Sequence, residues 1–277
     1  YFSLPNHPAE ILEELYTDLP PLKTGMYADI MKIFEAGRSL TIEPAAHYFE
    51  GGIRVATDMS TRVPGLFAAG ECAGGLFGAN RVSAATTEML IEGAQAGKTA
   101  AAYAADSDLQ KPDSAYLDQL EAALVQPFGQ KNGPTPQQLR KQLHEITGRS
   151  LTVIRCEPQL VQALNELEEL EQALQTVSLG DSQRVYNQQW RQYLELRNML
   201  PTARAITKSA LLRRESRGVH IRSDYLTTDN DQCLHNIVLS GSQLQAQRVP
   251  AVLTKCKPEA GAWRYTEYIE HIVDTMD

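Results

Sequence analysis

The sequence predicts an α/β part, followed by an α-helical bundle and a small β tail. Three observations predict this order. Glycines, charged residues and short apolar runs alternate between residues 41 and 105, and leucines then recur at spacings of three and four. After Gly218 the apolar residues alternate with polar ones, which is typical of strands, whereas the leucine spacing is typical of amphipathic helices. We therefore divide the chain into residues 1–40, 41–105, 106–217 and 218–277.

The composition is that of a globular protein. The chain has 277 residues, of which 22% are charged and 43% hydrophobic, enough to bury a sizeable core. The formal net charge of -8 disfavours a nucleic-acid partner. One basic cluster, at residues 208–222, breaks the acidic trend, but no aromatic side chains suited to stacking on bases interleave its arginines. We expect no nucleic acid to bind.

The cysteines and histidines favour no metal site. Cys72, Cys156, Cys233 and Cys256 are scattered without a Cys-x-x-Cys pair, and no two histidines have the spacing of metal ligands. Free thiols are typical of a reducing compartment, and no apolar run approaches the roughly 20 residues that span a bilayer. We expect a cytoplasmic protein that is at most peripheral to a membrane.

The first 67 residues predict short elements. The chain opens at Tyr1 with a sequence that resembles the middle of a protein, so we expect a fragment or a processed product. Helix signals favour helices at residues 8–16 and 27–35, and a strand at 40–42 leads into a histidine segment. Two strand-like runs between Gly52 and Phe67 are separated by turn residues, which favours a hairpin or meander.

The rest of the chain predicts longer helices. The stretch from residue 86 to 105 favours a helix that packs closely on a neighbour, because Gly93 and Gly97 fall on one face. Further elements are expected at residues 136–147, 157–177, 181–199 and 202–215 (helices of the bundle) and at 233–239 and 250–256 (strands of the tail).

A short apolar run ends in Gly70-Glu71. A carboxylate just past a strand end lies where α/β proteins place ligand contacts, and it can accept hydrogen bonds from ribose or ribityl hydroxyls. The pattern also fits an ordinary acid at a strand-to-turn junction.

The loop that follows, from Gly74 to Arg81, is rich in glycine. Its backbone can approach a ligand, and Arg81 can hold a carboxylate through a bidentate pair. Ser83 and Thr86 precede the next helix and can cap it, leaving N–H groups for an electron-rich acceptor. A solvated surface arginine is the alternative for Arg81.

Two further candidates contain histidine. His47 lies on an extended segment before Gly51-Gly52, although a lone histidine is more often structural. His220 lies in a cluster of both signs between Arg213 and Asp224. That cluster favours an ion-pair network that docks the bundle on another part of the protein, with an anion-binding patch as the alternative.

Together these motifs resemble the flavoprotein family of succinate dehydrogenase, fumarate reductase and L-aspartate oxidase. Its histidine segment is matched by Pro44-x-x-His47-Tyr48-x-x-Gly51-Gly52, its flavin-domain strand by Gly65-Leu66-Phe67-Ala68-x-Gly70-Glu71, and its arginine loop by Gly78-Ala79-Asn80-Arg81. The segment Arg213-Arg214-Glu215-Ser216-Arg217-Gly218-x-His220 resembles the family's helix end. The order of the motifs is specific, and the resemblance covers nearly the whole chain.

The resemblance implies a cofactor, FAD, and a set of site residues. It implies the C-terminal part of an FAD-binding α/β domain at residues 41–105, preceded by the end of a capping region and a linker. Arg81 and His47 would hold the carboxylates of the substrate. The residues implied near FAD are Gly70, Glu71, Ala79, Asn80, Ser83 and Thr86.

The family's N-terminal Gly-x-Gly-x-x-Gly turn and its capping domain have no match in this sequence. We therefore expect the 277-residue chain alone not to retain FAD, and its partners to include the flavin-binding and capping segments. Within the matched region, Phe77 stands where the family usually has His, and Glu50 where it has an uncharged residue. A carboxylate at Glu50 would repel a dianionic substrate if it faced the site.

The resemblance implies hydride transfer between flavin and a small carboxylate substrate, with an iron–sulfur subunit as a further partner. One alternative is an amino-acid oxidase that is similar to L-aspartate oxidase. Another is a separate structural or interaction subunit that completes a split flavoprotein.

Overall fold

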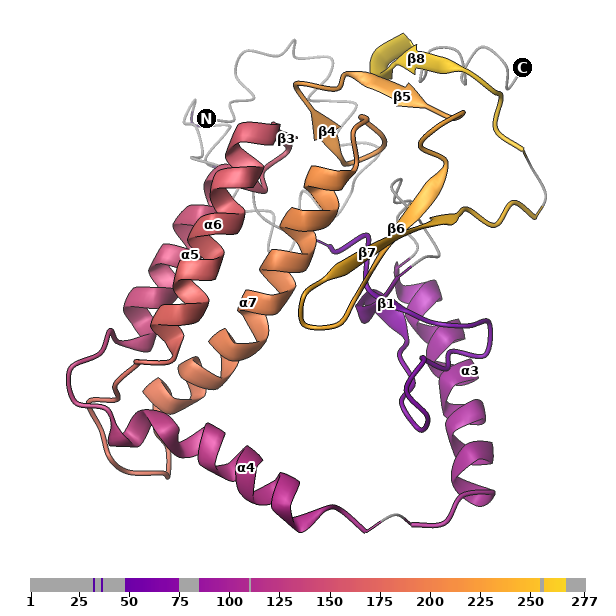
Figure 1. Cartoon of the computed structure of the whole chain (residues 1–277). Coiled ribbons are helices and arrows are strands. Elements are labelled where there is room, and N and C mark those ends of the chain that lie inside the picture. The colour runs from indigo at the N-terminus through magenta and orange to yellow at the C-terminus, as the bar shows by residue number, and fades with distance from the viewer. Residues whose placement is uncertain are drawn as a thin grey trace. The chain divides into compact units, whose positions relative to one another are not determined.

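The computed structural model describes residues 32, 36, 48–74, 85–109, 111–254 and 257–267. The chain divides into two compact units, residues 1–47 and 48–277, and the helices and strands below belong to the second. The helices predicted at 8–16 and 27–35, and the strand at 40–42, lie outside the described residues. Among the described residues of the second unit, the strands form four separate two-stranded pairings, and five α-helices precede the last five strands (Figure 1).

The α/β part begins with a close pair of very short strands. β1 (Ile53–Arg54) pairs in parallel with β2 (Ala73–Gly74), which follows the 3-10 turn η3 (Gly70–Cys72). The predicted hairpin is wrong: between Gly52 and Phe67 only one isolated antiparallel bridge forms, from Ser60 to Phe67. The apolar run before Gly70 is therefore irregular, because the partner of β1 lies beyond it.

Helix α3 (Ala85–Ala105) confirms the helix predicted at residues 86–105. Its glycines do not mark a close contact within the described residues: a Cβ added at Gly93 or Gly97 would meet nothing within 4 Å there. Met89, Leu90 and Ile91 on the same helix are more than half exposed.

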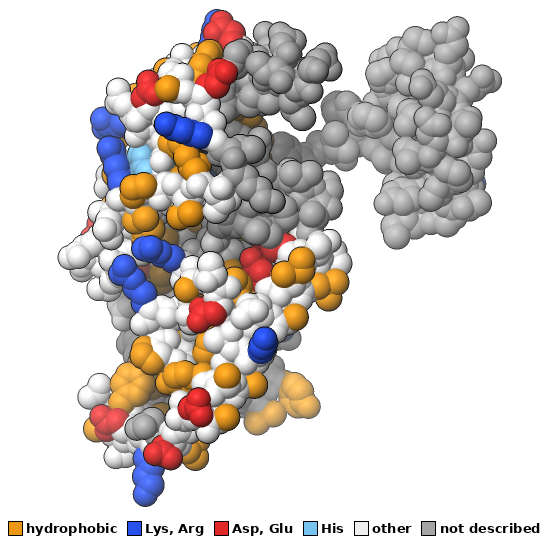
Figure 2. Space-filling model, turned by 90° about the vertical axis from the view of Figure 1, so that its right-hand side faces the viewer, with side chains coloured by type: hydrophobic (Ala, Val, Ile, Leu, Met, Phe, Trp, Pro, Cys, Tyr) orange, Lys and Arg blue, Asp and Glu red, His pale blue; other side chains and the backbone are white. Residues whose placement is uncertain are grey.

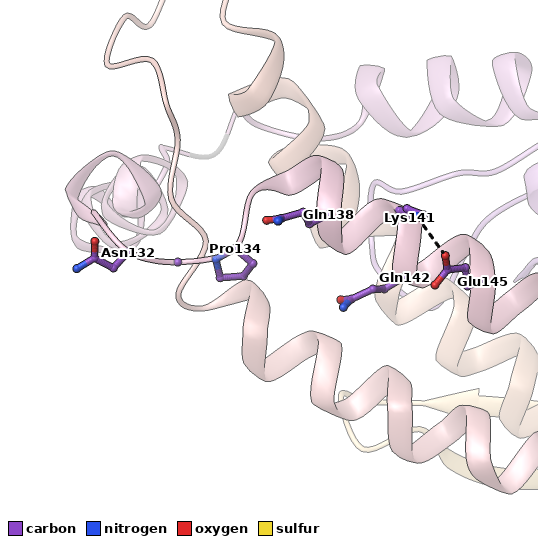
Figure 3. A pocket seen from close by; sticks show the side chains of 7 residues that line it. Asn132, Pro134, Gln138, Lys141, Gln142 and Glu145 are labelled. Carbon is purple, nitrogen blue, oxygen red and sulfur yellow. Dashed lines mark ion pairs between the residues drawn. The ribbon is translucent and has the colours of Figure 1, made fainter.

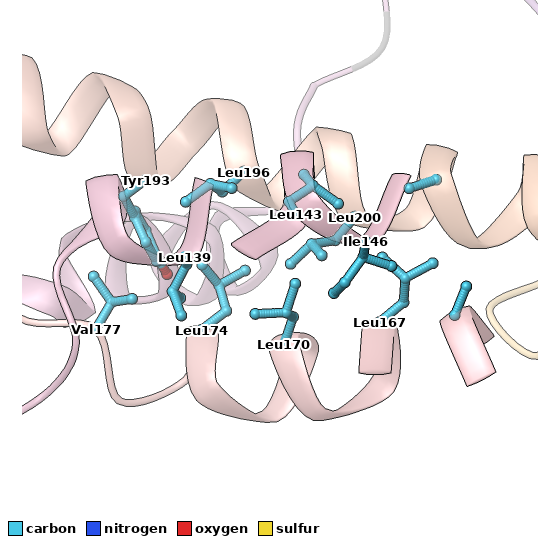
Figure 4. Packing of buried hydrophobic residues seen from close by; sticks show 12 residues of the cluster. Leu139, Leu143, Ile146, Leu167, Leu170, Leu174, Val177, Tyr193, Leu196 and Leu200 are labelled. Atoms are coloured by element: carbon cyan, nitrogen blue, oxygen red, sulfur yellow. The ribbon is translucent and has the colours of Figure 1, made fainter. Parts of the chain in front are cut away.

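The helical bundle is confirmed. It consists of α5 (Pro136–Ser150), α6 (Glu157–Leu174) and α7 (Gln188–Leu212), which pack on one another (Figure 1). The packed side chains in Figure 4 come from all three helices and from the residues just after α6. The buried cluster consists of Leu139, Leu143, Ile146, Ala163, Leu167, Leu170, Leu174, Val177, Tyr193, Leu196, Leu200 and Ala203.

Local signals explain where the bundle helices begin. Thr135 caps α5 in a capping box, in which its Oγ1 accepts from the Gln138 N–H and the Gln138 side chain accepts from the Thr135 N–H. Asn187 caps α7 through the N–H of Trp190 at 2.9 Å. Both helices therefore begin at a side chain that satisfies an otherwise unpaired N–H group.

Two helix predictions were wrong. The helices expected at 181–199 and 202–215 are the single helix α7, which continues through Pro201 because tertiary packing on both sides outweighs the one lost hydrogen bond. The structure also contains a helix that the sequence did not indicate, α4 (Ser114–Val125), which Asp113 caps. Near the C-terminal end of α4, the carbonyl of Leu124 accepts a hydrogen bond from the Trp190 side chain of α7.

The β tail is attached to the bundle and consists of short pairings. β3 (Ile154–Arg155) pairs in parallel with β4 (Ile221–Arg222), and β5 (Thr227–Asp229) pairs with β8 (Ala262–Arg264). β6 (His235–Ser240) and β7 (Gln245–Pro250) form a hairpin. The strand expected at 250–256 was misplaced, since a turn at Gly241 and Leu244, both with positive φ, sets the register so that β7 ends at Pro250.

Candidate functional site

Three of the eight predicted site residues lie in the described part of the chain: Gly70, Glu71 and Thr86. The other five lie outside the described residues, so their roles stay predictions. They are His47, Ala79, Asn80, Arg81 and Ser83.

Two hydrogen bonds hold the Gly70-Glu71 turn, and in each of them a glutamate carboxylate is the acceptor. Gly70 has φ +72°, a left-handed conformation that favours glycine, and its N–H donates to Glu92 Oε2 at 2.7 Å. Glu71, whose side chain is exposed, accepts the backbone N–H of Phe49 at 2.9 Å through Oε1. A carboxylate offers about four acceptor positions, so this bond leaves Glu71 able to accept from a ligand hydroxyl.

The segment that follows His47 is fixed to α3. The Tyr48 hydroxyl donates to Glu88 Oε2 at 2.6 Å, across 40 residues of sequence. Glu88 and Glu92 lie one helical turn apart and are only 4% and 8% exposed. The two acids therefore connect Tyr48 and the Gly-Glu turn to helix α3.

Two glycines of the matched region, Gly52 and Gly74, are explained by strand pairing. A Cβ at Gly52 would lie 2.4 Å from the Cys72 carbonyl oxygen, and one at Gly74 would lie 2.7 Å from the Gly52 nitrogen. Both positions require glycine because β1 and β2 approach each other's backbone. For Gly74, contact with the neighbouring strand replaces the predicted ligand contact.

Thr86 does not precede the helix, as predicted, but is the second residue of α3 and is exposed. It cannot be the N-cap, whose residue stands before the first helical one. Its place near FAD stays a prediction.

The charged cluster after α7 is the predicted ion-pair network. Glu215 is fully buried and accepts from Arg213 Nη1 at 2.6 Å and from Arg217 Nε and Nη2, both at 2.9 Å. Arg222, also fully buried, makes two 2.7 Å bonds to Asp224 and donates to the Ala210 carbonyl at the end of α7. The Arg222 guanidinium holds the pKa of Asp224 down at about 2. The network joins the bundle to the tail.

His220 is part of this network and is neutral. Its Nδ1 lies 2.9 Å from Arg155 Nη1, which can only donate, so the ring proton is assigned to Nε2, 3.2 Å from the Arg213 carbonyl oxygen. Burial and the nearby charges of Arg155, Arg213 and Arg222 lower the pKa of His220 to about 4. A neutral histidine fixed on both nitrogens is a structural residue.

On the face drawn in Figure 2, lysine and arginine side chains are interspersed with acidic and apolar ones. A surface hollow lies elsewhere, beside the first half of α5 (Figure 3). Its polar lining includes Lys141 and Glu145, an exposed ion pair at 3.7 Å. Gly70, Glu71 and Thr86, the predicted site residues that the structure describes, do not line it, so we assign it no function. Among the described residues no helix is long and apolar enough to cross a membrane.

Comparison with known proteins decides the family. Residues 140–262 match the family model described as fumarate reductase flavoprotein C-term, and residues 13–87 match the one described as FAD binding domain. The chain belongs to the fumarate reductase and succinate dehydrogenase flavoprotein family. Members of this family are FAD-dependent oxidoreductases.

Individual relatives agree with this assignment. An uncharacterized FAD-dependent oxidoreductase of Methanocaldococcus jannaschii is 31% identical over 90% of the chain and 44% of its own length. The fumarate reductase flavoprotein subunit of Mycobacterium tuberculosis is 34% identical over 78% of the chain and 39% of its own length. The chain thus spans less than half the length of these relatives.

Solved structures have the same fold. Mycobacterium smegmatis Sdh1 in complex with UQ1 matches with a TM-score of 0.76 and 31% identity over 87% of this chain and 41% of that one. E. coli quinol fumarate reductase matches with a TM-score of 0.78 and 26% identity over 94% of this chain and 45% of that one. The predicted fold class, the C-terminal part of a flavin-binding domain followed by a helical bundle, is confirmed.

Sequence reasoning missed Tyr48, Glu88 and Glu92 as parts of the site region. The sequence indicates no role for Tyr48 beyond its place in the histidine motif. The two acids carry a signal: they are spaced i, i+4 on a helix that is rich in Ala and has Met, Leu and Ile between the two acids. Acids on a mostly apolar helix need hydrogen-bond donors wherever that face is buried.

Proposed function

We propose that this chain forms part of an FAD-dependent oxidoreductase that transfers a hydride between the flavin and a small carboxylate substrate, as fumarate reductases do. The observation that carries the proposal is the joint match to the flavin-binding and C-terminal family models, with the histidine, Gly-Glu and arginine motifs in order. The described geometry of the Gly-Glu turn supports it.

The residues of the turn fit the cofactor. Glu71 is exposed, is held in place by the Phe49 N–H, and keeps acceptor positions for a ribose or ribityl hydroxyl of FAD. Gly70 takes a left-handed conformation that lets the chain turn sharply just before Glu71. In this proposal Ala79, Asn80, Ser83 and Thr86 lie near the cofactor as well.

When bound, FAD supplies the hydride acceptor and donor. The chain's own part is to orient the substrate and to stabilise charge. Arg81 would hold one carboxylate of the substrate through a bidentate pair, and His47 would hold the other. Fixed positive groups at a developing negative charge accelerate the transfer because they need no reorganisation during the reaction.

The test is Arg81→Lys in the full-length enzyme, with the flavin-binding and capping segments present and FAD bound. Lysine keeps the charge but loses the planar fork, so we expect kcat/KM for fumarate, with a reduced viologen dye as electron donor, to fall about 100-fold or more. The flavin content should not change. Arg62→Lys, at an exposed arginine of the 48–74 segment, is the matched control and should keep full activity. Near-normal turnover of the Arg81 variant would refute the proposal.

The same assay distinguishes the reduction of fumarate from the oxidation of an amino acid. Release of hydrogen peroxide on addition of L-aspartate, with no reduction of fumarate by the dye, would replace the proposed reaction by an amino-acid oxidase activity. We favour fumarate or succinate because the relatives named above include a fumarate reductase subunit and Sdh1.

We also propose partners. The flavin-binding and capping segments that the relatives have, and an iron–sulfur subunit for electron transfer, would complete the enzyme. The exposed apolar side chains Met89, Leu90 and Ile91 on α3 are consistent with contact to such a segment. Attachment to a membrane, if any, would be peripheral and through partner subunits.

A further inference from the structure

Glu88 and Glu92 are the acids that this inference concerns. Both carboxylates are buried on one face of α3, 4% and 8% exposed. A buried carboxylate is costly unless hydrogen bonds compensate for lost hydration. The donors of those hydrogen bonds therefore identify the parts of the chain that the two acids fix in place.

The first acid holds the segment next to His47. Tyr48 donates its hydroxyl to Glu88 Oε2 at 2.6 Å, a short, charge-assisted bond. Tyr48 is joined to His47 by one peptide bond, and neighbouring Cα atoms are about 3.8 Å apart. An anchored Tyr48 therefore fixes one end of the peptide that carries His47.

The second acid holds the turn that carries Glu71. Glu92 Oε2 accepts the Gly70 N–H at 2.7 Å, at the first residue of η3. A Cβ at Gly70 would come within 3.3 Å of Met89 Cβ, so the turn lies directly on α3. Glu92 thereby fixes the backbone on which the Glu71 side chain stands.

The two anchors are joined into one closed circuit. Glu71 Oε1 accepts the Phe49 N–H at 2.9 Å, and Phe49 follows Tyr48 in the chain. Starting from α3, the circuit runs from Glu88 through Tyr48 and Phe49 to Glu71, then through Gly70 to Glu92 and back along one helical turn. Three hydrogen bonds thus connect segments 22 to 40 residues apart.

We propose that Glu88 and Glu92 are positioning residues: Glu88 sets the place of His47, and Glu92 sets the place of Glu71. This rests on the proposed function, in which His47 holds the substrate and Glu71 holds FAD. In this proposal the two acids act on the protein and not directly on substrate or cofactor. Each acts through a hydrogen bond to the backbone turn or to the tyrosine beside the functional residue.

The circuit is tested first without activity, by amide hydrogen exchange in the 277-residue chain. In Glu92→Ala the Gly70 amide loses its acceptor, and in Glu88→Ala the Phe49 amide loses its support, so both should exchange at least about 10-fold faster. Gln95→Ala, which removes a bond to Thr99 on the same helix, is the control and should change neither amide. An unchanged Gly70 amide in Glu92→Ala, or an unchanged Phe49 amide in Glu88→Ala, would overturn the circuit.

The second test uses the enzyme with FAD bound and separates the two acids. We expect Glu88→Ala to lower kcat for fumarate about 10- to 100-fold with normal flavin content, since small misplacements cost rate. We expect Glu92→Ala to lower flavin content or affinity instead. Glu88→Gln keeps an acceptor oxygen and should recover activity to within about 3-fold of the parent.

A merely structural role predicts a different result: lower stability in both variants with unchanged kcat per bound flavin. Where Glu88→Ala does not fold, Tyr48→Phe removes the same bond from the other side and should give the same loss of kcat. The double variant Tyr48→Phe with Glu88→Ala should be no slower than either single variant, because both remove one interaction.

Arg81→Lys separates this inference from the proposed function. An inactive Arg81→Lys together with a fully active Glu88→Ala would refute the positioning role alone. An active Arg81→Lys would refute the proposed function, and the exchange measurement would then decide whether the circuit exists.

Discussion

At the scale of single residues, the glycines of this chain stand in three different surroundings. Gly52 and Gly74 let two strands approach, Gly70 takes a left-handed conformation, and Gly93 and Gly97 meet no described neighbour. The sequence shows only that a glycine stands at each place. Its reason depends on which atoms the fold brings near, and these lie about 20 residues away for Gly52 and Gly74.

We predict that Gly52→Ala lowers the free energy of unfolding by about 1 to 3 kcal/mol. The added Cβ would lie 2.4 Å from the Cys72 carbonyl oxygen, and a backbone atom cannot rotate away. Urea denaturation followed by circular dichroism measures the change. Gly51→Ala is the matched control, since its Cβ would meet nothing within 4 Å. Equal stability of the two variants would contradict the explanation.

At the scale of elements, the end of α7 is fixed by charged residues from the tail. Arg222 Nη1 donates to the carbonyls of Ala210, Leu211 and Arg213, which the helix itself leaves unpaired. Glu215 then brings Arg213 and Arg217 together. The helix end and the β tail are therefore one structural unit, although the sequence changes from helical to alternating pattern there.

We predict that Glu215→Ala destabilises the protein by about 3 to 5 kcal/mol. It would leave two arginine side chains, each only about one fifth exposed, without their buried carboxylate. Glu215→Gln keeps an acceptor and should cost less. In contrast Glu145→Ala, which breaks an exposed pair with Lys141, should change stability by less than about 0.5 kcal/mol in the same urea titration. A loss at Glu215 as small as at Glu145 would show that the network is not stabilising.

At the scale of the whole molecule, the stability of the fold should depend on the protonation of His220. The ring is buried between the bundle and the tail, with three arginines nearby, and the pKa is lowered from 6.5 to about 4. Between these two pH values the unfolded chain binds more protons than the folded one. Stability is therefore complete above pH 6.5 and is lost as the pH falls toward 4.

We predict a loss on the order of 3 kcal/mol from His220 between pH 6.5 and 4, from the shift in its pKa. Denaturation curves at half-unit pH steps measure it. In His220→Gln the amide can still accept from Arg155 and donate to the Arg213 carbonyl but does not titrate, so the slope between pH 4.5 and 6.5 should flatten. A slope unchanged in this variant would assign the pH dependence to other groups.

The sequence by itself determined the parts that depend on local patterns. Leucines at spacings of three and four gave the helices of the bundle, because side chains on one face of a helix are close neighbours in sequence. The order of the motifs gave the family, and the mixed charges after α7 gave the ion-pair network.

Only the tertiary structure decided which distant segments meet. It paired β1 in parallel with β2 rather than in a hairpin, and carried α7 through Pro201. It also placed Tyr48 and Gly70 on the two acids of α3. The β1–β2 pairing and these hydrogen bonds join residues about 20 to 40 positions apart, and a local sequence pattern does not identify such distant partners.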